Sequence, residues 1–230
     1  SYWLRDRRYI VNVIVVPIAA VVSTVPLLVA GVPFEIAVLL PVPIMALFFG
    51  WLPHNDLAYD STALWMHIAS GMRGAPDRIG RLVPVLLIGI PVLAVSLPLA
   101  IVAHGRWAIL PAMIGVCAAL FLAGLGLSSV SSVLAPYAVS RPGDSPFQQP
   151  QRTGSGGVVA QGLVMAGAIA TALPSILLTW GAIGGDTIDA MLAMWVGIGA
   201  GAVVLVIGVT VGSVLFEGRA TRLMEFAEAT

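Results

Sequence analysis

The ionisable side chains that could carry chemistry gather in one segment, residues 53–81. It holds six of the 22 charged residues of the chain, together with His54 and His67. A histidine close to an aspartate can work as a general acid and base, and His54 lies near Asp56. A lipid-modifying enzyme of the membrane surface would need His54, Asp56 and His67 to act together. The alternative is a polar loop in which the carboxylates begin helices.

Other reactive arrangements are absent from the sequence or incomplete. Cys117 is the single cysteine, so neither an intrachain disulfide nor a thiolate metal cluster can form. A serine nucleophile needs a base within reach, and no histidine lies in an apolar stretch. Residues 152–157 look like a phosphate-binding loop but lack its lysine and the preceding strand. We therefore expect no catalytic residue and no metal-binding residue in this chain.

Composition decides the class of protein. Of the 230 residues, 59% are hydrophobic and 10% are charged, whereas a soluble domain has about 45–50% apolar and about 25% charged residues. The net charge is zero, so no strong field attracts nucleic acid. These values exclude a soluble enzyme, a disordered chain and a basic nucleic-acid-binding protein, and they predict an integral membrane protein.

Apolar runs predict six membrane-spanning helices, because about 20 apolar residues cross a bilayer. The whole chain, 1–230, is expected to form one all-α transmembrane domain. Pro41 and Pro43 predict a kink in the second span, and three further prolines predict one in the third. The predicted spans are 10–32, 36–52, 82–103, 107–135, 158–180 and 190–216, with loops 53–81 and 136–157 and a tail 217–230 on the cytoplasmic side.

Arginine placement predicts the orientation of these spans. If the N-terminus is cytoplasmic, Arg106 alone falls in an outer loop, and the outer loops otherwise carry acidic residues. The cytoplasmic segments then hold Arg5, Arg7, Arg8, Arg73, Arg78, Arg81, Arg141, Arg152, Arg219 and Arg222. We therefore expect both ends of the chain in the cytoplasm.

The segment between spans two and three predicts a short amphipathic helix. Asp56 and Asp60 are candidate N-caps, and Gly71 and Gly74 can end the helix. Its apolar face would carry Leu64, Trp65, Ile68 and Met72. Such a helix either rests in the lipid headgroups or docks into a cytoplasmic partner, and periodicity alone does not favour the second interpretation.

Small residues recur at four-residue spacing in the predicted spans. In lipid this spacing lets two helix backbones approach closely. The contact can lie within the bundle or between two copies of the chain, and both interpretations stay open. The residues concerned are Gly124 and Ser128, Gly197 and Gly201, and Gly208 and Gly212.

Three segments resemble the membrane subunit of bacterial ABC exporters of the type 2 class, especially an actinobacterial-like branch with large permeases. Residues 2–9, YWLRDRRY, are similar to the sequence YWRRDPRY at the start of the last repeat of such permeases, with Arg7 in place of proline. The other two segments are 55–65, NDLAYDSTALW, followed by Gly74, Asp77, Arg78, Gly80 and Arg81, and Pro136-Tyr137 with 141–147, RPGDSPF.

The resemblance implies a six-helix permease half, here the C-terminal half, with a coupling helix after the second span. ATP and magnesium would then bind to a separate ATP-binding cassette subunit, and this chain would bind no cofactor of its own. The residues expected to contact that subunit are Asp56, Asp60, Leu64, Trp65, Ile68, Met72 and Arg73.

The expected function is therefore that of the permease part of an ATP-driven exporter in the bacterial plasma membrane. Its expected partners are the ATP-binding subunit, a second permease half or copy, and membrane lipid. Because the predicted spans carry almost no ionisable groups, the substrate would be lipophilic or amphiphilic. The alternative is a structural or accessory subunit of a larger membrane complex without its own transport path.

Overall fold

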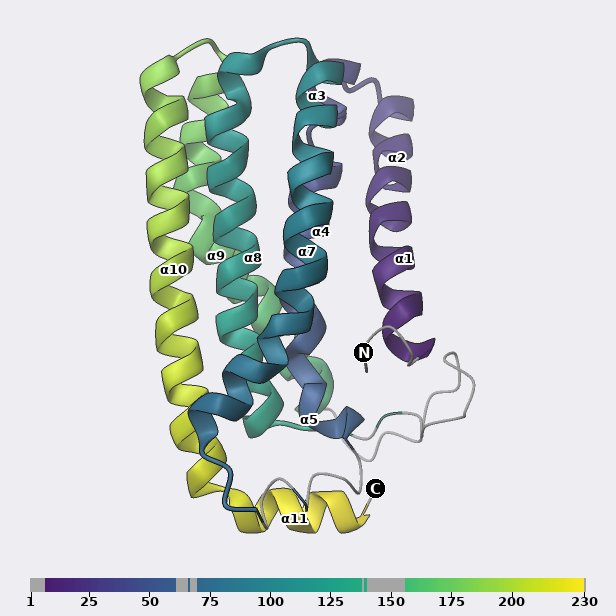
Figure 1. Ribbon diagram of the computed structural model, residues 1–230. Coiled ribbons are helices and arrows are strands. Elements are labelled where there is room, and N and C mark those ends of the chain that lie inside the picture. Colours follow the sequence, from purple (N-terminus) through teal and green to yellow (C-terminus); the bar gives the residue numbers. More distant parts are fainter. Residues whose placement is uncertain (1–6, 61–65, 67–69, 138, 140–155, 230) are drawn as a thin grey trace.

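The structure, a computed structural model, describes residues 7–60, 66, 70–137, 139 and 156–229. These residues form a bundle of long, roughly parallel helices, with no strand among them (Figure 1). The helices, with short 3₁₀ turns marked η, are α1 (Arg7–Val22), α2 (Thr24–Val29), α3 (Phe34–Ala37), α4 (Pro41–Trp51), η1 (Leu52–Asn55), α5 (Asp56–Tyr59), α7 (Gly74–His104), η3 (Trp107–Ile109), α8 (Leu110–Leu134), α9 (Gly156–Ile183), α10 (Thr187–Gly218) and α11 (Ala220–Ala229).

Six helical stretches are long and apolar enough to cross a membrane. The predicted all-α fold with six spans is thereby confirmed, and the chain is a multi-pass membrane protein. The stretches are Ile10–Val29, Phe34–Tyr59, Gly74–His104, Trp107–Leu134, Gly157–Ile183 and Thr187–Gly218.

Helix α8 is the centre of the bundle, with α4, α9 and α10 packed around it. Helices α1 and α2 stand apart at the edge of the molecule (Figure 1). Val16 and Ala20 are the buried residues in the span that α1 and α2 form. The helices around α8 are thus closely packed, whereas most of the surface of α1 and α2 is exposed.

Glycines bring the central helices into backbone contact. Gly115 of α8 faces Gly197 of α10, and Gly126 faces Gly208, so that a Cβ on any of the four would come within 3.0 Å of partner backbone. Gly124 meets Gly50 of α4 in the same way. We call the four residues Gly115, Gly126, Gly197 and Gly208 the glycine seam. Without a hydrophobic drive between helices in lipid, such close approach supplies the dispersion energy that holds a bundle together.

The six predicted packing residues all lie inside the bundle. Gly197 and Gly208 belong to the glycine seam, and Gly124 contacts Gly50. Gly201 faces the backbone of Ala118, Gly212 faces Ser129, and the Ser128 hydroxyl donates to the Gly50 carbonyl at 3.0 Å. The structure therefore uses these positions for packing within one chain.

The second span departs from the predicted bounds 36–52. It begins at Phe34, is broken between Ala37 and Pro41, and continues through η1 and α5 to Tyr59. The break lies directly before the two prolines that predicted a kink. Pro53 does not stop the helix, because it occupies an early position of η1, where its missing N–H is not needed.

The third span begins eight residues earlier than the predicted 82. Helix α7 starts at Gly74, so residues 74–81, predicted as loop, form its first two turns. Charge explains the error: Asp77, Arg78 and Arg81 lower the hydropathy of these turns, but they pair with other groups in the structure. Helix α7 continues through Pro84, Pro91 and Pro98, and its first turns run obliquely to the rest (Figure 1).

Tight turns join the spans at the end of the bundle away from α11. Each contains a glycine with positive φ, Gly31 at 83°, Gly105 at 87° and Gly185 at 110°, a conformation that other residues rarely adopt. Asp186 begins α10 by accepting bonds from the amides of Ile188 (2.8 Å) and Asp189 (3.2 Å).

Helix α11 lies across the opposite end of the bundle, roughly perpendicular to α10 (Figure 1). Its Leu223 is buried with Leu57 of α5, Val133 of α8 and Phe216 of α10. This small second core joins four elements, and its Phe216 ring also lies against the guanidinium of Arg78.

Candidate functional site

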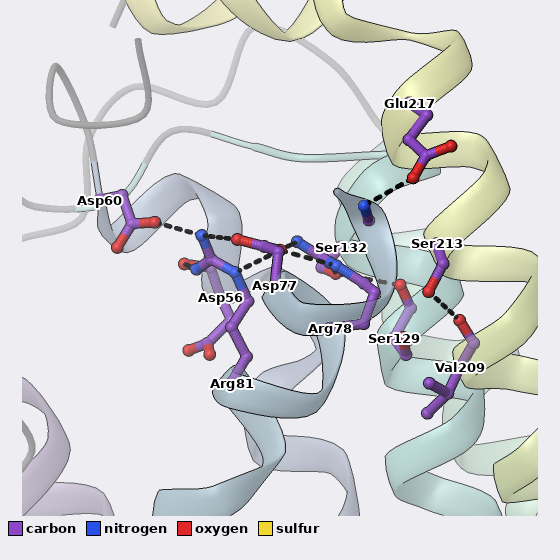
Figure 2. Close-up of polar contacts among 11 residues, drawn as sticks. Asp56, Asp60, Asp77, Arg78, Arg81, Ser129, Ser132, Val209, Ser213 and Glu217 are labelled. Carbon is purple, nitrogen blue, oxygen red and sulfur yellow. Dashed lines mark hydrogen bonds and ion pairs between the residues drawn. The ribbon is translucent and has the colours of Figure 1, made fainter. Parts of the chain in front are cut away.

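A cluster of charged residues ties together the two ends of the loop between spans two and three. Arg81 of α7 pairs with Asp60 at the end of α5 and, at 3.0 Å, with Asp77 one turn earlier in α7 (Figure 2). It also donates to the Asp56 backbone carbonyl at 3.2 Å. The residue before the loop and the helix after it are thus held by one guanidinium.

Arg78 extends this cluster to the central helix. Its guanidinium pairs with Asp77 and donates to the Ser132 hydroxyl of α8 at 2.9 Å. It also lies over the Phe216 ring, 5.1 Å from its centroid, which is a favourable place for a cation. Arg78 is 1% exposed and Asp77 is 5% exposed. Burial makes both charges costly to leave unpaired. We call Asp60, Asp77, Arg78 and Arg81 the charged cluster.

The segment before the loop is fixed to the end of α8 by a separate set of bonds. The Asn55 amide donates to the Tyr137 carbonyl at 2.9 Å, and the Tyr137 amide donates to the Asn55 side-chain oxygen at 3.1 Å. The Tyr137 hydroxyl lies 2.6 Å from His54 Nε2. Asn55 and His54 are both buried. Their bonds to Tyr137 therefore fix both the segment at the end of the second span and the segment that follows α8.

The N-terminus of α7 is fixed to α10. The Gly74 amide donates to the Glu217 carboxylate at 2.8 Å (Figure 2). A Cβ at Gly74 would collide with the Ser213 backbone, so only glycine fits here. The residue at the N-cap position, Arg73, makes no capping bond with its own side chain. Glu217 therefore replaces the missing cap from another helix.

The predicted coupling residues fall into two groups. Asp60 belongs to the charged cluster, whereas Met72 and Arg73 are exposed beside it. Asp56 is buried as the first residue of α5, whose N-cap position is held by Asn55. The amphipathic helix itself, including Leu64, Trp65 and Ile68, lies outside the described residues.

Reasoning from the sequence missed most of the cluster. Asp77 and Arg81 stand four residues apart, a spacing that brings side chains together on a helix; it would have predicted their pair once residues 74–81 were assigned to a helix. The contacts of Asn55 with Tyr137 and of Gly74 with Glu217 join distant parts of the chain, and no local signal indicates them.

The chemistry of the site is that of a structural junction. The His54 Nδ1 lies 2.8 Å from the Trp51 carbonyl, which can only accept, so Nδ1 carries the hydrogen. In the neutral ring Nε2 then accepts a hydrogen bond from the Tyr137 hydroxyl, so that both ring nitrogens of His54 have a partner. Within the ranges that the structure describes, no three His, Cys, Asp or Glu side chains gather as metal ligands.

Comparison with known proteins identifies no relative. No protein-family model matches the chain, and no curated protein and no solved structure is significantly similar to it. The geometry of the charged cluster and the resemblance of the three sequence segments are therefore the grounds for assigning a function.

Proposed function

We propose that this chain is the permease part of an ATP-driven exporter in the bacterial plasma membrane, working with a separate ATP-binding subunit. Both chain ends face the cytoplasm in this proposal, as the arginine distribution favours. ATP and magnesium bind to the partner subunit. The substrate is lipophilic or amphiphilic, because the six spans offer apolar and hydroxyl groups with few charges.

The observation that carries the proposal is the bridge made by Arg81. A loop that passes a mechanical push to the membrane helices must be attached firmly where it leaves and re-enters them. Arg81 joins Asp60, before the loop, to Asp77, after it. A partner that displaces residues 61–73 would therefore move the ends of α5 and α7 together.

Further contacts would pass that displacement into the bundle. Arg78 connects α7 to α8 through Ser132, and Asn55 connects the end of η1 to Tyr137. The break between Ala37 and Pro41 and the three prolines of α7 give the second and third spans places to bend. The push would thus reach helices that can change shape.

Helices α1 and α2 offer a surface for the second permease half or copy. Ile14, Ile18 and Val22 of α1 are each more than half exposed. They lie four residues apart on one helical face, which suits packing against another helix. An exporter needs two such halves to enclose a path, so this open edge agrees with the proposal.

The test is association with the ATP-binding subunit. The chain is purified with the ATPase that co-purifies with it, and affinity is compared with that of a Trp65→Ala variant. A buried tryptophan at an interface centre contributes about 2 kcal/mol or more, so association should weaken by roughly thirtyfold. The matched control is Trp107→Ala, an exposed tryptophan of η3, which lies at the end of the bundle away from α11 (Figure 1).

Two results would count against the proposal. If no ATPase is bound to the wild-type chain, the accessory-subunit function takes its place. If both tryptophan variants bind the ATPase as the wild type does, the loop is not the docking surface. Retained folding of Trp65→Ala, checked by its unfolding temperature, ensures that a loss of binding is local.

A further inference from the structure

A groove opens on the side of the bundle between the last turns of α8 and the first turns of α9. Its volume is about 500 Å³, within the range of small-molecule sites. Leu134, Val159 and Leu163 line it and are 44%, 58% and 66% exposed. The groove therefore faces the space that surrounds the bundle, which for these apolar helices is lipid.

One lining residue differs from the others. Ser131 is the single residue with a polar side chain among the described residues that line the groove. It is 8% exposed, and its hydroxyl has no hydrogen-bond partner. A buried hydroxyl without a partner destabilises the fold, because it has lost its hydrogen bonds to water. A ligand acceptor that bonds to it therefore gains more binding free energy than one that must first break an existing hydrogen bond.

Comparison with other hydroxyls sets Ser131 and its neighbour Ser129 apart. In membrane helices serine and threonine usually donate to the carbonyl one turn earlier. Thr171, Thr179 and Ser213 do so here, at 2.8, 2.7 and 2.6 Å. Ser131 makes no such bond, although it lies within the last turn of α8, where the carbonyl one turn earlier is present. Rotation about its single side-chain bond can turn the hydroxyl toward a group in the groove.

The depth of Ser131 identifies the group that it could meet. The span Trp107–Leu134 has 28 residues and is about 42 Å long at 1.5 Å per residue. It exceeds the hydrocarbon core of about 30 Å by roughly 6 Å at each end. Ser131 lies three residues, about 5 Å, from the end of α8. That is the boundary where the ester carbonyls of glycerolipids lie.

We propose that this groove binds one acyl chain of a membrane glycerolipid, with the Ser131 hydroxyl donating to the ester carbonyl of that chain. Leu127, Val130 and Leu163 contact the methylene groups beyond the ester. Two other lateral grooves of the described residues differ in this respect. The one between α7 and α8, beside Cys117, has apolar walls only, and the one lined by Thr24 and Ser96 has hydroxyls that already donate to Val21 and Met45. The site does not depend on the proposed exporter function.

Ser129 provides a matched control. It lies on the same helix two residues earlier, is also buried, and its hydroxyl is also without a partner. However, its hydroxyl faces Gly212 of α10 and not the groove. Loss of either hydroxyl removes the same atom from a buried place, but only one of the two could contact a lipid in the groove.

The experiment measures labelling of the whole chain in nanodiscs by a phosphatidylcholine with a photoreactive group on one ester-linked acyl chain. Mass spectrometry quantifies adducts on residues 127–135 and 156–164 against the fraction of probe lipid. Labelling of the wild type should saturate, and Ser131→Ala should need about fivefold more probe for half-saturation, the equivalent of one neutral hydrogen bond. Ser129→Ala should match the wild type.

Two further arms separate the hydrogen bond from the cavity. An ether-linked probe, which lacks the carbonyl, should bind the wild type about as weakly as the ester probe binds Ser131→Ala. Ala160→Phe, which fills the groove, should abolish saturable labelling there. Equal half-saturation of Ser131→Ala and Ser129→Ala, equal binding of both probes, or saturable labelling of Ala160→Phe would each overturn the proposal.

Discussion

The glycine seam and the charged cluster hold the same helix α8 by opposite means. At the seam, Gly115 and Gly126 touch Gly197 and Gly208 of α10 with no side chain between the backbones. At the cluster, the long side chain of Arg78 donates a hydrogen bond to Ser132, and its guanidinium is paired with Asp77. The first contact depends on shape alone, and the second depends on charge.

This difference indicates which part of the molecule is rigid and which part can move. Backbones in direct contact cannot shift without opening a gap or a collision, because interiors are closely packed. Within the cluster, the pair of Arg81 with Asp60 is the more exposed one, with side chains 12% and 19% exposed, so it can exchange partners with water. We therefore expect α8 and α10 to stay together while the loop end at Asp60 changes position.

The largest effect is expected from breaking the charged cluster. Arg78→Met removes the cation from a buried pair and leaves Ser132 without its donor. Removing one partner of a buried ion pair typically costs about 3–5 kcal/mol. Denaturant unfolding in detergent, followed by circular dichroism, should show a loss of that size. A loss below about 1 kcal/mol would mean that the cluster is a surface feature.

A second variant separates charge from packing in that result. Asp77 would remain in the Arg78→Met variant with Arg81 as its cation. Adding Asp77→Asn removes the buried carboxylate, so the double variant should be less unstable than the sum of the two single variants. Strict additivity would show that the two side chains do not interact.

A smaller loss is expected at the seam. Gly208→Ala places a Cβ within 3.0 Å of the Gly126 backbone, and overpacking of this kind costs about 1–3 kcal/mol. Gly199→Ala on the same helix meets nothing within 4 Å and should gain about 0.5–1 kcal/mol from better helix propensity. Changes of opposite sign in the free energy of unfolding of the two variants would support backbone contact at the seam, and changes of the same sign would refute it.

The two regions also differ in how far the sequence predicts them. Hydropathy alone indicated six spans, because membrane helices must be apolar over a fixed length. Four-residue spacing indicated Gly197 and Gly208 as packing positions, but not their partners Gly115 and Gly126 on α8. Four-residue spacing shows that one face of a helix carries small residues. It does not show which other helix packs against that face.

The charged cluster was hardly predictable. A charged stretch lowers hydropathy, so hydropathy predicts a loop for residues 74–81 although they form helical turns. Whether a charge ends a span depends on whether a partner neutralises it, and Arg78 and Arg81 find theirs on α5, α7 and α8 only after folding. The contact of His54 with Tyr137 is of the same kind, since the partners stand 83 positions apart in the chain.

The smallest effect is expected where the two regions meet, at the bond from the Gly74 amide to Glu217. Glu217 lies in the last turn of α10, the seam helix, and caps α7, which carries most of the cluster. Glu217→Ala removes the cap and should cost about 1 kcal/mol. Glu217→Gln keeps an acceptor oxygen but loses the charge near the helix N-terminus, and should cost about 0.3–1 kcal/mol.

Salt distinguishes the two contributions of Glu217. The charge term should shrink as ionic strength rises, because the site is near the surface, whereas the hydrogen bond should persist. The difference between Glu217→Gln and the wild type should therefore vanish at about 1 M salt, while Glu217→Ala stays destabilised. Glu225→Gln, an exposed carboxylate of α11, is the control for the change in net charge. If Glu225→Gln destabilises as much as Glu217→Gln, the loss in Glu217→Gln comes from the net charge of the protein and not from a carboxylate placed at the N-terminus of α7.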